Sequence, residues 1–412
     1  MKKALLSSVI FSVMTAAVAH ADSSSPYTLY GVFDEALRYT TNVDKAQDHS
    51  FGASQGLFNG SRLGFKGAND IDSDSKVIYA LEAGFIMGTG QNDQQGQLFG
   101  RQAWLGVQNT TLGTLTFGRQ YGVFSDAVGT GDVFGERHGN MIPAGNVGIN
   151  GTGTSVPAGG GQSNYGSTIS ENGFMYQEMG YRWDNSLIYK KTIDQVSFSL
   201  MHSFNVADAS TVTPGKSQNN TMSAVALSYN AAGFKISGSY QSEKDLNGNY
   251  HTEAGVGTQY MYTEKNGVYF LAFNSKFDPS FVRINGTNSE FGAPGAFGRK
   301  DTTVSLSSNY YALENVNLIG ALYSNKASNV QAVNDSGTRK GLLVAVDYFM
   351  SKNADVYLMG ASTNFDGSLV GITPSGAVAS KPINGGLGSS DGLGNPNTNG
   401  KTIMTGFRYR FN

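Results

Sequence analysis

The 412-residue chain lacks cysteine, carries few charged residues and has little histidine, and each shortage excludes a class of protein. Without cysteine the chain can form neither a disulfide framework nor a thiolate metal site. Charged residues make up 15% of the chain, and the five histidines show no short metal-ligand spacing. The formal net charge of −2 gives no basic excess of the kind that binds nucleic acid. We therefore expect neither a metal site nor a nucleic-acid partner.

Catalytic motifs are also missing from the sequence. It contains no Gly-x-Ser-x-Gly nucleophile elbow, and no paired-carboxylate motif stands out. The glycine-rich runs near Gly129 and Gly159 lack the strand–turn–helix setting of a nucleotide site. We expect no enzyme activity, no catalytic residue and no cofactor.

The only long apolar run lies at the N-terminus. Lys2 and Lys3 precede a mostly apolar stretch over residues 4–18, and Ala19, His20 and Ala21 form a small-x-small cleavage site. This order is typical of a secretory signal peptide, whereas an uncleaved membrane anchor needs about 20 apolar residues. We expect residues 1–21 to be removed. Residues 22–412 then form a single domain with 27 bases and 31 acids, because two lysines leave with the signal.

Glycine, tyrosine and phenylalanine are abundant, at 54, 21 and 24 residues. Segments of roughly 9–13 residues alternate apolar and polar side chains between turn residues, as membrane-crossing strands do. An exported chain without spanning helices can cross lipid only as a closed barrel, because every backbone group must be hydrogen-bonded. Sixteen segments fit the pattern: 27–39, 57–68, 75–87, 99–108, 113–120, 181–190, 196–204, 223–230, 234–242, 256–262, 268–277, 302–311, 316–323, 341–349, 354–362 and 402–411.

The connections between these segments alternate throughout, with eight long and seven short. Residues 40–55 form a long polar connection, for example, whereas residues 69–72 form a short turn. Outer-membrane barrels combine an even strand number with short turns at one end and long loops at the other. The pattern predicts an all-β fold, a sixteen-stranded antiparallel transmembrane β-barrel.

The longest connection, residues 121–180, is rich in Gly, Ser, Thr and Asn and carries the acids Asp126, Asp132 and Glu136. A structureless connection of this length is unusual in a compact domain unless it is functional. We expect this loop to fold back into the barrel and narrow its lumen.

The last segment shows the alternation most clearly. Phe407, Tyr409 and Phe411 share one face, and Arg408 and Arg410 share the other. An arginine that faces lipid near the midplane costs about 2–4 kcal/mol, so we expect both arginines to face water inside the barrel. An ordinary strand of a soluble barrel with exposed arginines is the alternative, and the signal peptide argues against it.

Several motifs, spread over the whole mature chain, carry a family resemblance. They are TLYG (28–31), SRLGFKG (61–67), GTLTFGRQY (113–121), YRWDNSLIY (181–189), VDYFMSKNADVY (346–357) and GFRYRF (406–411). Together and in this order they resemble the trimeric general porins of Gram-negative outer membranes, specifically the β-proteobacterial branch. The resemblance implies an outer-membrane homotrimer in contact with lipid and lipopolysaccharide. It also implies a third external loop folded into the lumen as a constriction, and passive diffusion of ions and small hydrophilic solutes without a cofactor.

Two features depart from the family pattern. The constriction loop and the last long connection, residues 363–401, are longer than the family leads us to expect, which leaves the pore diameter open. The chain ends in Asn412, whereas the family usually ends on an aromatic residue that is recognised during outer-membrane assembly.

A pore of this kind selects solutes by size and by rings of charged side chains. We expect the basic wall of the constriction to consist of Arg38, Arg62, Lys66, Arg119 and Arg182. We expect the acidic loop that faces this wall to contribute Asp126, Asp132 and Glu136. In a regular strand Arg119 would share the face of Leu115 and Phe117. A bulge, or a position beyond the lipid band, is therefore needed to turn it inward.

Four functions remain open from the sequence. The leading one is a diffusion porin, and the alternative is a substrate-specific channel whose long loops form a binding site, which lumen-facing aromatic residues would favour. An outer-membrane enzyme would need a nucleophile and a histidine at the barrel rim, and a purely adhesive barrel would not need the constriction. Ion preference is also open, because the wall arginines favour anions and the loop acids favour cations. The physiological solute cannot be read from the sequence.

Overall fold

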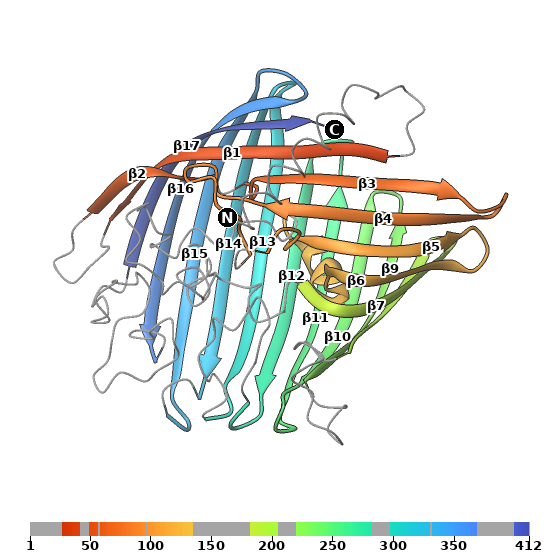
Figure 1. The fold of residues 1–412 in the computed structure, drawn as a ribbon. Coiled ribbons are helices and arrows are strands. Elements are labelled where there is room, and N and C mark those ends of the chain that lie inside the picture. The colour runs from red at the N-terminus through yellow and green to blue at the C-terminus, as the bar shows by residue number, and fades with distance from the viewer. Residues whose placement is uncertain are drawn as a thin grey trace, which may run out of the picture.

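Seventeen β-strands and two short helical elements make up the described part of the chain, which the computed structural model folds into a barrel (Figure 1). The structure describes residues 27–41, 49–56, 58–94, 97–134, 182–204, 220–281, 297–329, 332–368 and 399–411. The predicted signal peptide, Glu136 and Asn412 lie outside these ranges. No helix within them is long and apolar enough to cross a membrane.

The strands are 7 to 15 residues long and are distributed along the whole described part of the chain. They are β1 (Tyr27–Thr41), β2 (His49–Gln55), β3 (Arg62–Asp70), β4 (Ser75–Gly84), β5 (Gln102–Asn109), β6 (Gly113–Tyr121), β7 (Arg182–Ile193), β8 (Val196–Ser203), β9 (Thr221–Ala231), β10 (Phe234–Lys244), β11 (Tyr250–Met261), β12 (Gly267–Phe277), β13 (Lys300–Leu313), β14 (Val316–Ser328), β15 (Ser336–Phe349), β16 (Ala354–Gly367) and β17 (Asn399–Phe411). The helical elements are α2 (Val123–Val128) and η1 (Gly129–Gly131).

Strand β1 closes the barrel. One of its edges pairs antiparallel with β17, with Gly31 opposite Phe411 and Thr40 opposite Thr402. Its other edge pairs with β3 over residues 27–32 and with β2 over residues 35–41. From β3 onward each strand pairs antiparallel with its neighbour in sequence. Because β2 and β3 share one edge of β1, they occupy one position in the wall, and the barrel has the sixteen positions that the alternation predicts.

The prediction of a polar connection over residues 40–55 is wrong for its second half, because His49–Gln55 form strand β2. The segment has one large apolar residue, Phe51, so it shows no alternation that could indicate a strand. Its stability comes instead from backbone pairing with β1, which only the folded barrel provides.

Large apolar side chains cover the outer face of the barrel, and polar side chains turn inward. In β13, Val304, Leu306 and Tyr310 are 38–52% exposed, whereas Ser305 and Ser307 between them are buried. A protein surrounded by water would reverse this arrangement. The alternation therefore suits a wall that faces lipid outside and a polar interior inside, as predicted from the sequence.

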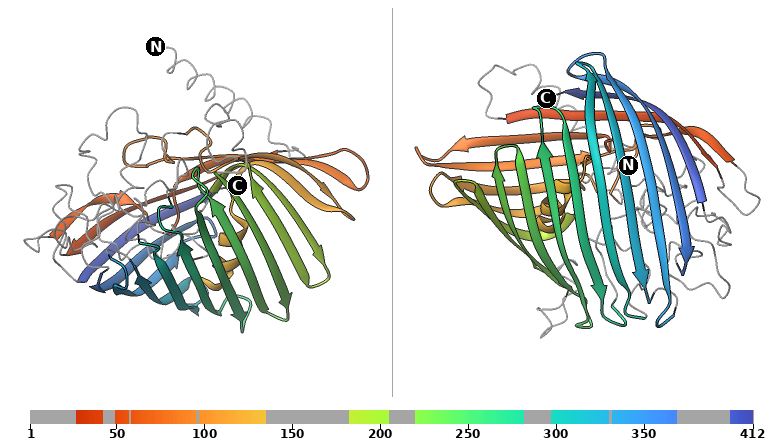
Figure 2. Two further views of the ribbon diagram at one scale, coloured as in Figure 1. Left: turned by 90° about the horizontal axis from the view of Figure 1, so that it is seen from below. Right: turned by 180° about the vertical axis from the view of Figure 1, so that it is seen from behind.

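The strands are strongly tilted and twisted. In Figure 1, β1, β3 and β4 run across the view while β13 to β16 run steeply, and Figure 2 shows β7 to β17 as one continuous curved wall. Barrel closure requires such a tilt, because flat strands cannot bring the first and last edges together.

The described beginning of the long loop, residues 123–134, lies inside the barrel; we call it the inserted segment. Helix α2 contacts the strands from β8 to β12, and Phe124 and Val128 are fully buried there. Glycines on β11 allow this close approach, because a Cβ at Gly257 would lie 2.1 Å from the carbonyl oxygen of Val128. The expectation that the loop folds into the lumen thus holds for the residues that the structure describes.

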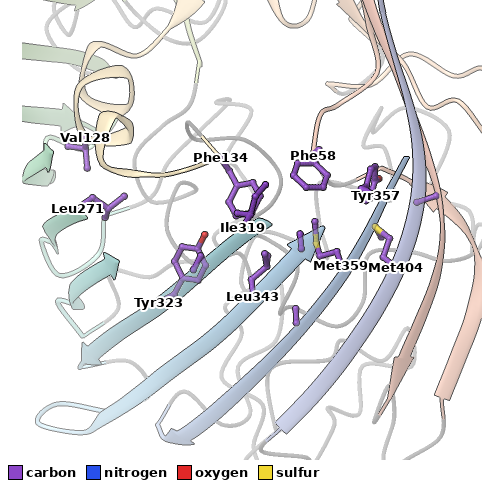
Figure 3. Packing of buried hydrophobic residues seen from close by; sticks show 14 of the residues in the cluster. Phe58, Val128, Phe134, Leu271, Ile319, Tyr323, Leu343, Tyr357, Met359 and Met404 are labelled. Atoms are coloured by element: carbon purple, nitrogen blue, oxygen red, sulfur yellow. The ribbon is translucent and has the colours of Figure 1, made fainter. Parts of the chain in front are cut away.

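The inserted segment then crosses toward β14–β16. Figure 3 shows Val128 beside Leu271 on one side and Phe134 beside Ile319 on the other. The ring of Phe134 lies 5.6 Å from that of Phe58, which belongs to the link between β2 and β3. An inward-facing apolar band on β14–β17 receives these two rings: Ile319, Tyr323, Leu343, Tyr357, Met359 and Met404.

Candidate functional site

Three arginines from separate parts of the wall converge on Glu82 of β4 and Tyr121 of β6. Arg101 Nε lies 2.6 Å from Glu82 Oε1, and Arg62 Nη1 lies 4.0 Å from the same oxygen. The Tyr121 hydroxyl accepts hydrogen bonds from Arg101 Nη2 at 3.0 Å and from Arg182 Nη2 at 3.2 Å. The Arg182 guanidinium also stacks 4.7 Å from the Tyr121 ring. We call these five residues the basic cluster.

The register of the barrel explains why these residues meet. Arg62 begins β3 and pairs with the last residue of β4, two positions beyond Glu82. Gln102 of β5 pairs with Glu82, so Arg101 arrives beside it. Tyr121 ends β6 opposite Arg182, which begins β7. All five residues therefore lie at the strand ends that the long connections join.

Tyr30 and Lys66 extend the basic cluster toward the short-turn end of the barrel. The Tyr30 hydroxyl donates to Glu82 Oε2 at 2.8 Å, and Lys66 Nζ lies 5.1 Å from the centre of the Tyr30 ring. Gly64 leaves room for that ring, because a Cβ there would lie 2.2 Å from it. With Lys66 included, the region holds four cationic side chains and one carboxylate, with Arg182 linked to that carboxylate through Tyr121 and Lys66 through Tyr30. This part of the interior is therefore positively charged.

The other two predicted wall bases are not members of the basic cluster, although Arg119 lies close enough to interact electrostatically with Arg182 and Tyr121. Arg38 is buried on β1 with the inward parity of Ala36 and Thr40. Arg119 is buried at an irregularity in the β6–β7 register, between Gly118 and Gln120. This is the position at which the sequence requires a bulge if Arg119 is to turn inward. Its Nε donates to the Gly100 carbonyl at 2.7 Å, and its guanidinium pairs with Asp184. Arg119 thus belongs to an ion pair that joins β6, β7 and the connection before β5.

The predicted loop acids contact the wall at other places than the basic cluster. Asp126 of α2 lies 3.2 Å from Lys190 Nζ on β7, and both side chains are about half exposed. Asp132 is buried and accepts a hydrogen bond from the Tyr323 hydroxyl at 3.4 Å. Glu136 lies outside the described residues. The structure therefore places Asp126 opposite a lysine that the sequence did not single out.

Arg408 and Arg410 enter an ion-pair network at the short-turn end of the interior. Arg408 Nη2 lies 2.8 Å from Asp347 and 3.0 Å from Asp355, and Arg410 pairs with Asp355 as well. Arg408 Nη1 also donates to the Asn59 side chain at 3.0 Å. The network joins β15, β16 and β17 to the link between β2 and β3, so its first role is to hold the barrel closed.

Replacing Arg408 with alanine should destabilise the barrel by about 3–5 kcal/mol, because it leaves the buried Asp347 without its cation and Asp355 with only the partly exposed Arg410. Asp347 and Asp355 are both buried. Urea unfolding of the refolded barrel would measure the loss. Arg410→Ala is the matched control: its side chain is 31% exposed and Asp355 keeps Arg408, so the loss should be smaller. Equal losses in the two variants would contradict this assignment.

Sequence reasoning missed Arg101, Glu82 and Tyr121 as members of the cluster. The predicted segment 99–108 includes Arg101, but β5 begins at Gln102, so the strand alternation does not place the Arg101 side chain. Tyr121 stood at the edge of a long loop. Only the register that joins β4, β5, β6 and β7 brings these residues together.

The described residues were also compared with the ligand sets that hold metal ions in proteins. Within the described ranges, no group of three or more histidine, aspartate or glutamate side chains is placed to hold a metal ion.

Comparison with known proteins agrees with the architecture. The family model of Gram-negative porins matches residues 7–368. An outer membrane porin protein of Bordetella pertussis is 33% identical over 193 residues, which is 44% of this chain and 46% of that protein. The match thus spans about half of that relative. Outer membrane porin F of Salmonella typhimurium is 22% identical over 66% of this chain and 68% of its own length.

Solved structures show the same fold at low sequence identity. An anion-selective porin from Comamonas acidovorans superposes with a TM-score of 0.66 at 15% identity, covering 93% of this chain and 99% of that one. A trimer form of OmpT from Vibrio cholerae superposes with a TM-score of 0.54 at 14% identity, again covering 93% and 99%.

Proposed function

The chain belongs to the Gram-negative porin family, and from that premise we propose that it forms a water-filled outer-membrane channel for passive diffusion, with a preference for anions. Ions and small hydrophilic solutes pass through the barrel interior, which the inserted segment narrows. The proposal rests on the wall of sixteen strand positions, the apolar outer face and the segment inside the lumen.

The basic cluster is the single observation that carries the anion preference. The cluster holds three guanidinium groups and one carboxylate, and Lys66 adds a further cation nearby. Confined charge of one sign raises the local concentration of the opposite ion, because low-dielectric walls focus the field. The similar porin of Comamonas acidovorans is anion-selective, which is consistent with this proposal.

The channel works as a homotrimer in contact with outer-membrane lipid and lipopolysaccharide. The trimeric OmpT structure supports this assembly by its similarity in fold. The apolar outer face supplies the surface that lipid or a second subunit covers. No step of the transport requires a cofactor or a catalytic residue.

The apolar band inside the barrel does not favour the alternative of a substrate-specific channel. Its large side chains would form a track for apolar solutes only if they were open to the lumen. Leu343, Met359 and Met404 are buried, and Phe58 and Phe134 pack into the same cluster. This band therefore anchors the inserted segment.

Osmotic swelling of proteoliposomes tests the diffusion function. We expect swelling rates for neutral sugars to fall steadily with solute size and to rise linearly with concentration, because passage needs no binding step. A rate that saturates at low millimolar sugar would instead support a substrate-specific channel.

A further inference from the structure

A cavity of about 660 Å³ lies between the inserted segment and the inner wall. We propose that it binds hydroxylated organic anions, of the kind that sugar acids represent. Pockets of about 300–1,000 Å³ hold small-molecule ligands. The proposal rests on the channel function and goes beyond it by naming a class of solute.

The wall side of the cavity supplies two ammonium groups. Lys190 of β7 and Lys235 of β10 both line it, together with the polar side chains of Ser199, Ser228 and Gln259. Among the described residues, Lys235 forms no ion pair, so its charge is available to a ligand. Lys190 pairs with Asp126, but both side chains are about half exposed. Such exposed pairs contribute about 0–1 kcal/mol, so a ligand hydroxyl group can compete for Lys190 and Asp126.

The inserted segment supplies two carboxylates, of which Asp126 lies 3.2 Å from Lys190 Nζ. Asp126 and Asp132 both line the cavity, and Asp132 is only 3% exposed. Carboxylates accept strong, charge-assisted hydrogen bonds from hydroxyl groups, and they repel a second anionic group. The favoured ligand therefore has one anionic end for Lys235 and hydroxyl groups for the Asp126–Lys190 pair and for Asp132.

The remaining lining fits the carbon skeleton of such a ligand. Val123, Ala127, Val133 and Phe134 present a small apolar surface, and Tyr269 adds an aromatic ring. The face of a sugar chain that carries C–H groups can pack against these side chains. A larger apolar solute would be disfavoured, because most of the lining is polar or charged.

The cavity lies closer to the short-turn end of the barrel than the basic cluster does. Lys190, Lys235 and Gln259 lie near the ends of their strands that short turns join, at residues 194–195, 232–233 and 262–266. The basic cluster lies at the opposite, long-connection end of β3–β7. An anion that passes the cluster therefore reaches the cavity on the short-turn side of the inserted segment.

Single-channel recording with gluconate as the probe tests this site. Gluconate added from the short-turn side should interrupt the current, whereas the same concentration of glucose, which has the hydroxyls but no charge, should not. Lys235→Gln should shorten the interruptions about tenfold, because it removes a charge-assisted contact. Lys352→Gln, in the short turn between β15 and β16, is the matched control and should leave them unchanged. Equal interruption by gluconate and glucose, or unchanged interruptions in Lys235→Gln, would overturn the proposal.

A binding measurement separates this site from the channel function. If the folded barrel does not conduct, the diffusion function fails, but calorimetric titration of gluconate into the detergent-solubilised barrel still tests the cavity. Binding that Lys235→Gln weakens and Lys352→Gln preserves supports the site. Conduction without gluconate binding overturns the site and leaves the diffusion function intact.

Discussion

The double variant Arg62→Gln/Arg182→Gln should lose the anion preference of the channel, with the ratio of chloride to potassium permeability falling about tenfold or more at low salt. Two unit charges about 4 Å apart in water interact with about 1 kcal/mol, which corresponds to about a fivefold change in local ion concentration for each charge removed. The variant keeps Arg101, which lies 2.6 Å from Glu82 and neutralises it. The cluster thus loses its excess charge while its buried ion pair stays intact.

Reversal potentials in a salt gradient measure this change. Lys265→Gln/Lys352→Gln removes the same number of charges from two short turns and should leave the ratio nearly unchanged. The difference between variant and wild type should shrink at 1 M salt, because the Debye length falls to about 3 Å. A double variant that keeps the wild-type ratio would show that the basic cluster does not set ion preference.

Replacing Gly257 with leucine should raise the unitary conductance. A Cβ at this position would lie 2.1 Å from the carbonyl oxygen of Val128 and 2.7 Å from the nitrogen of Gly131. Since both contacts are backbone atoms, no side-chain rotation relieves them, and overpacking of this kind costs about 1–3 kcal/mol. We expect α2 and η1 to leave the wall and the lumen to widen.

Gly320→Leu on β14 is the matched control for this variant. A Cβ at Gly320 has no neighbouring atom within 4 Å, so the same substitution should leave the conductance at its wild-type value. Heat-modifiable mobility on gels would confirm that both variants form folded barrels. A folded Gly257→Leu barrel with wild-type conductance would show that the inserted segment does not limit flow.

The strand pattern could be predicted from the sequence because it depends on local chemistry. Inward and outward side chains alternate along each strand, and the chain must satisfy this alternation wherever lipid lies on one side. The irregularity near Arg119 was foreseeable for the same reason. Strict alternation would put the charged Arg119 side chain on the outward face, so the strand had to be irregular there. Strand β2 escaped prediction because its pairing with β1 does not require any pattern in its own residues.

Side-chain partners could not be predicted, because they depend on register between strands that are distant in sequence. Arg62 and Arg182 were recognised as wall bases, but nothing local indicated that Arg101, Glu82 and Tyr121 would join them. In the same way, the acid Asp126 was recognised, whereas its partner Lys190 follows from the position of α2 against the wall. Residue types and faces were predictable, and the contacts among them required the closed barrel.

The most direct test of an anion-preferring diffusion channel is the reversal potential of the refolded wild-type protein in a planar bilayer under a potassium chloride gradient. We predict stable openings in steps of three, and a dilute side that becomes negative because chloride crosses more readily than potassium. A dilute side that becomes positive would contradict the anion preference. A folded barrel that gives no openings would contradict the channel itself.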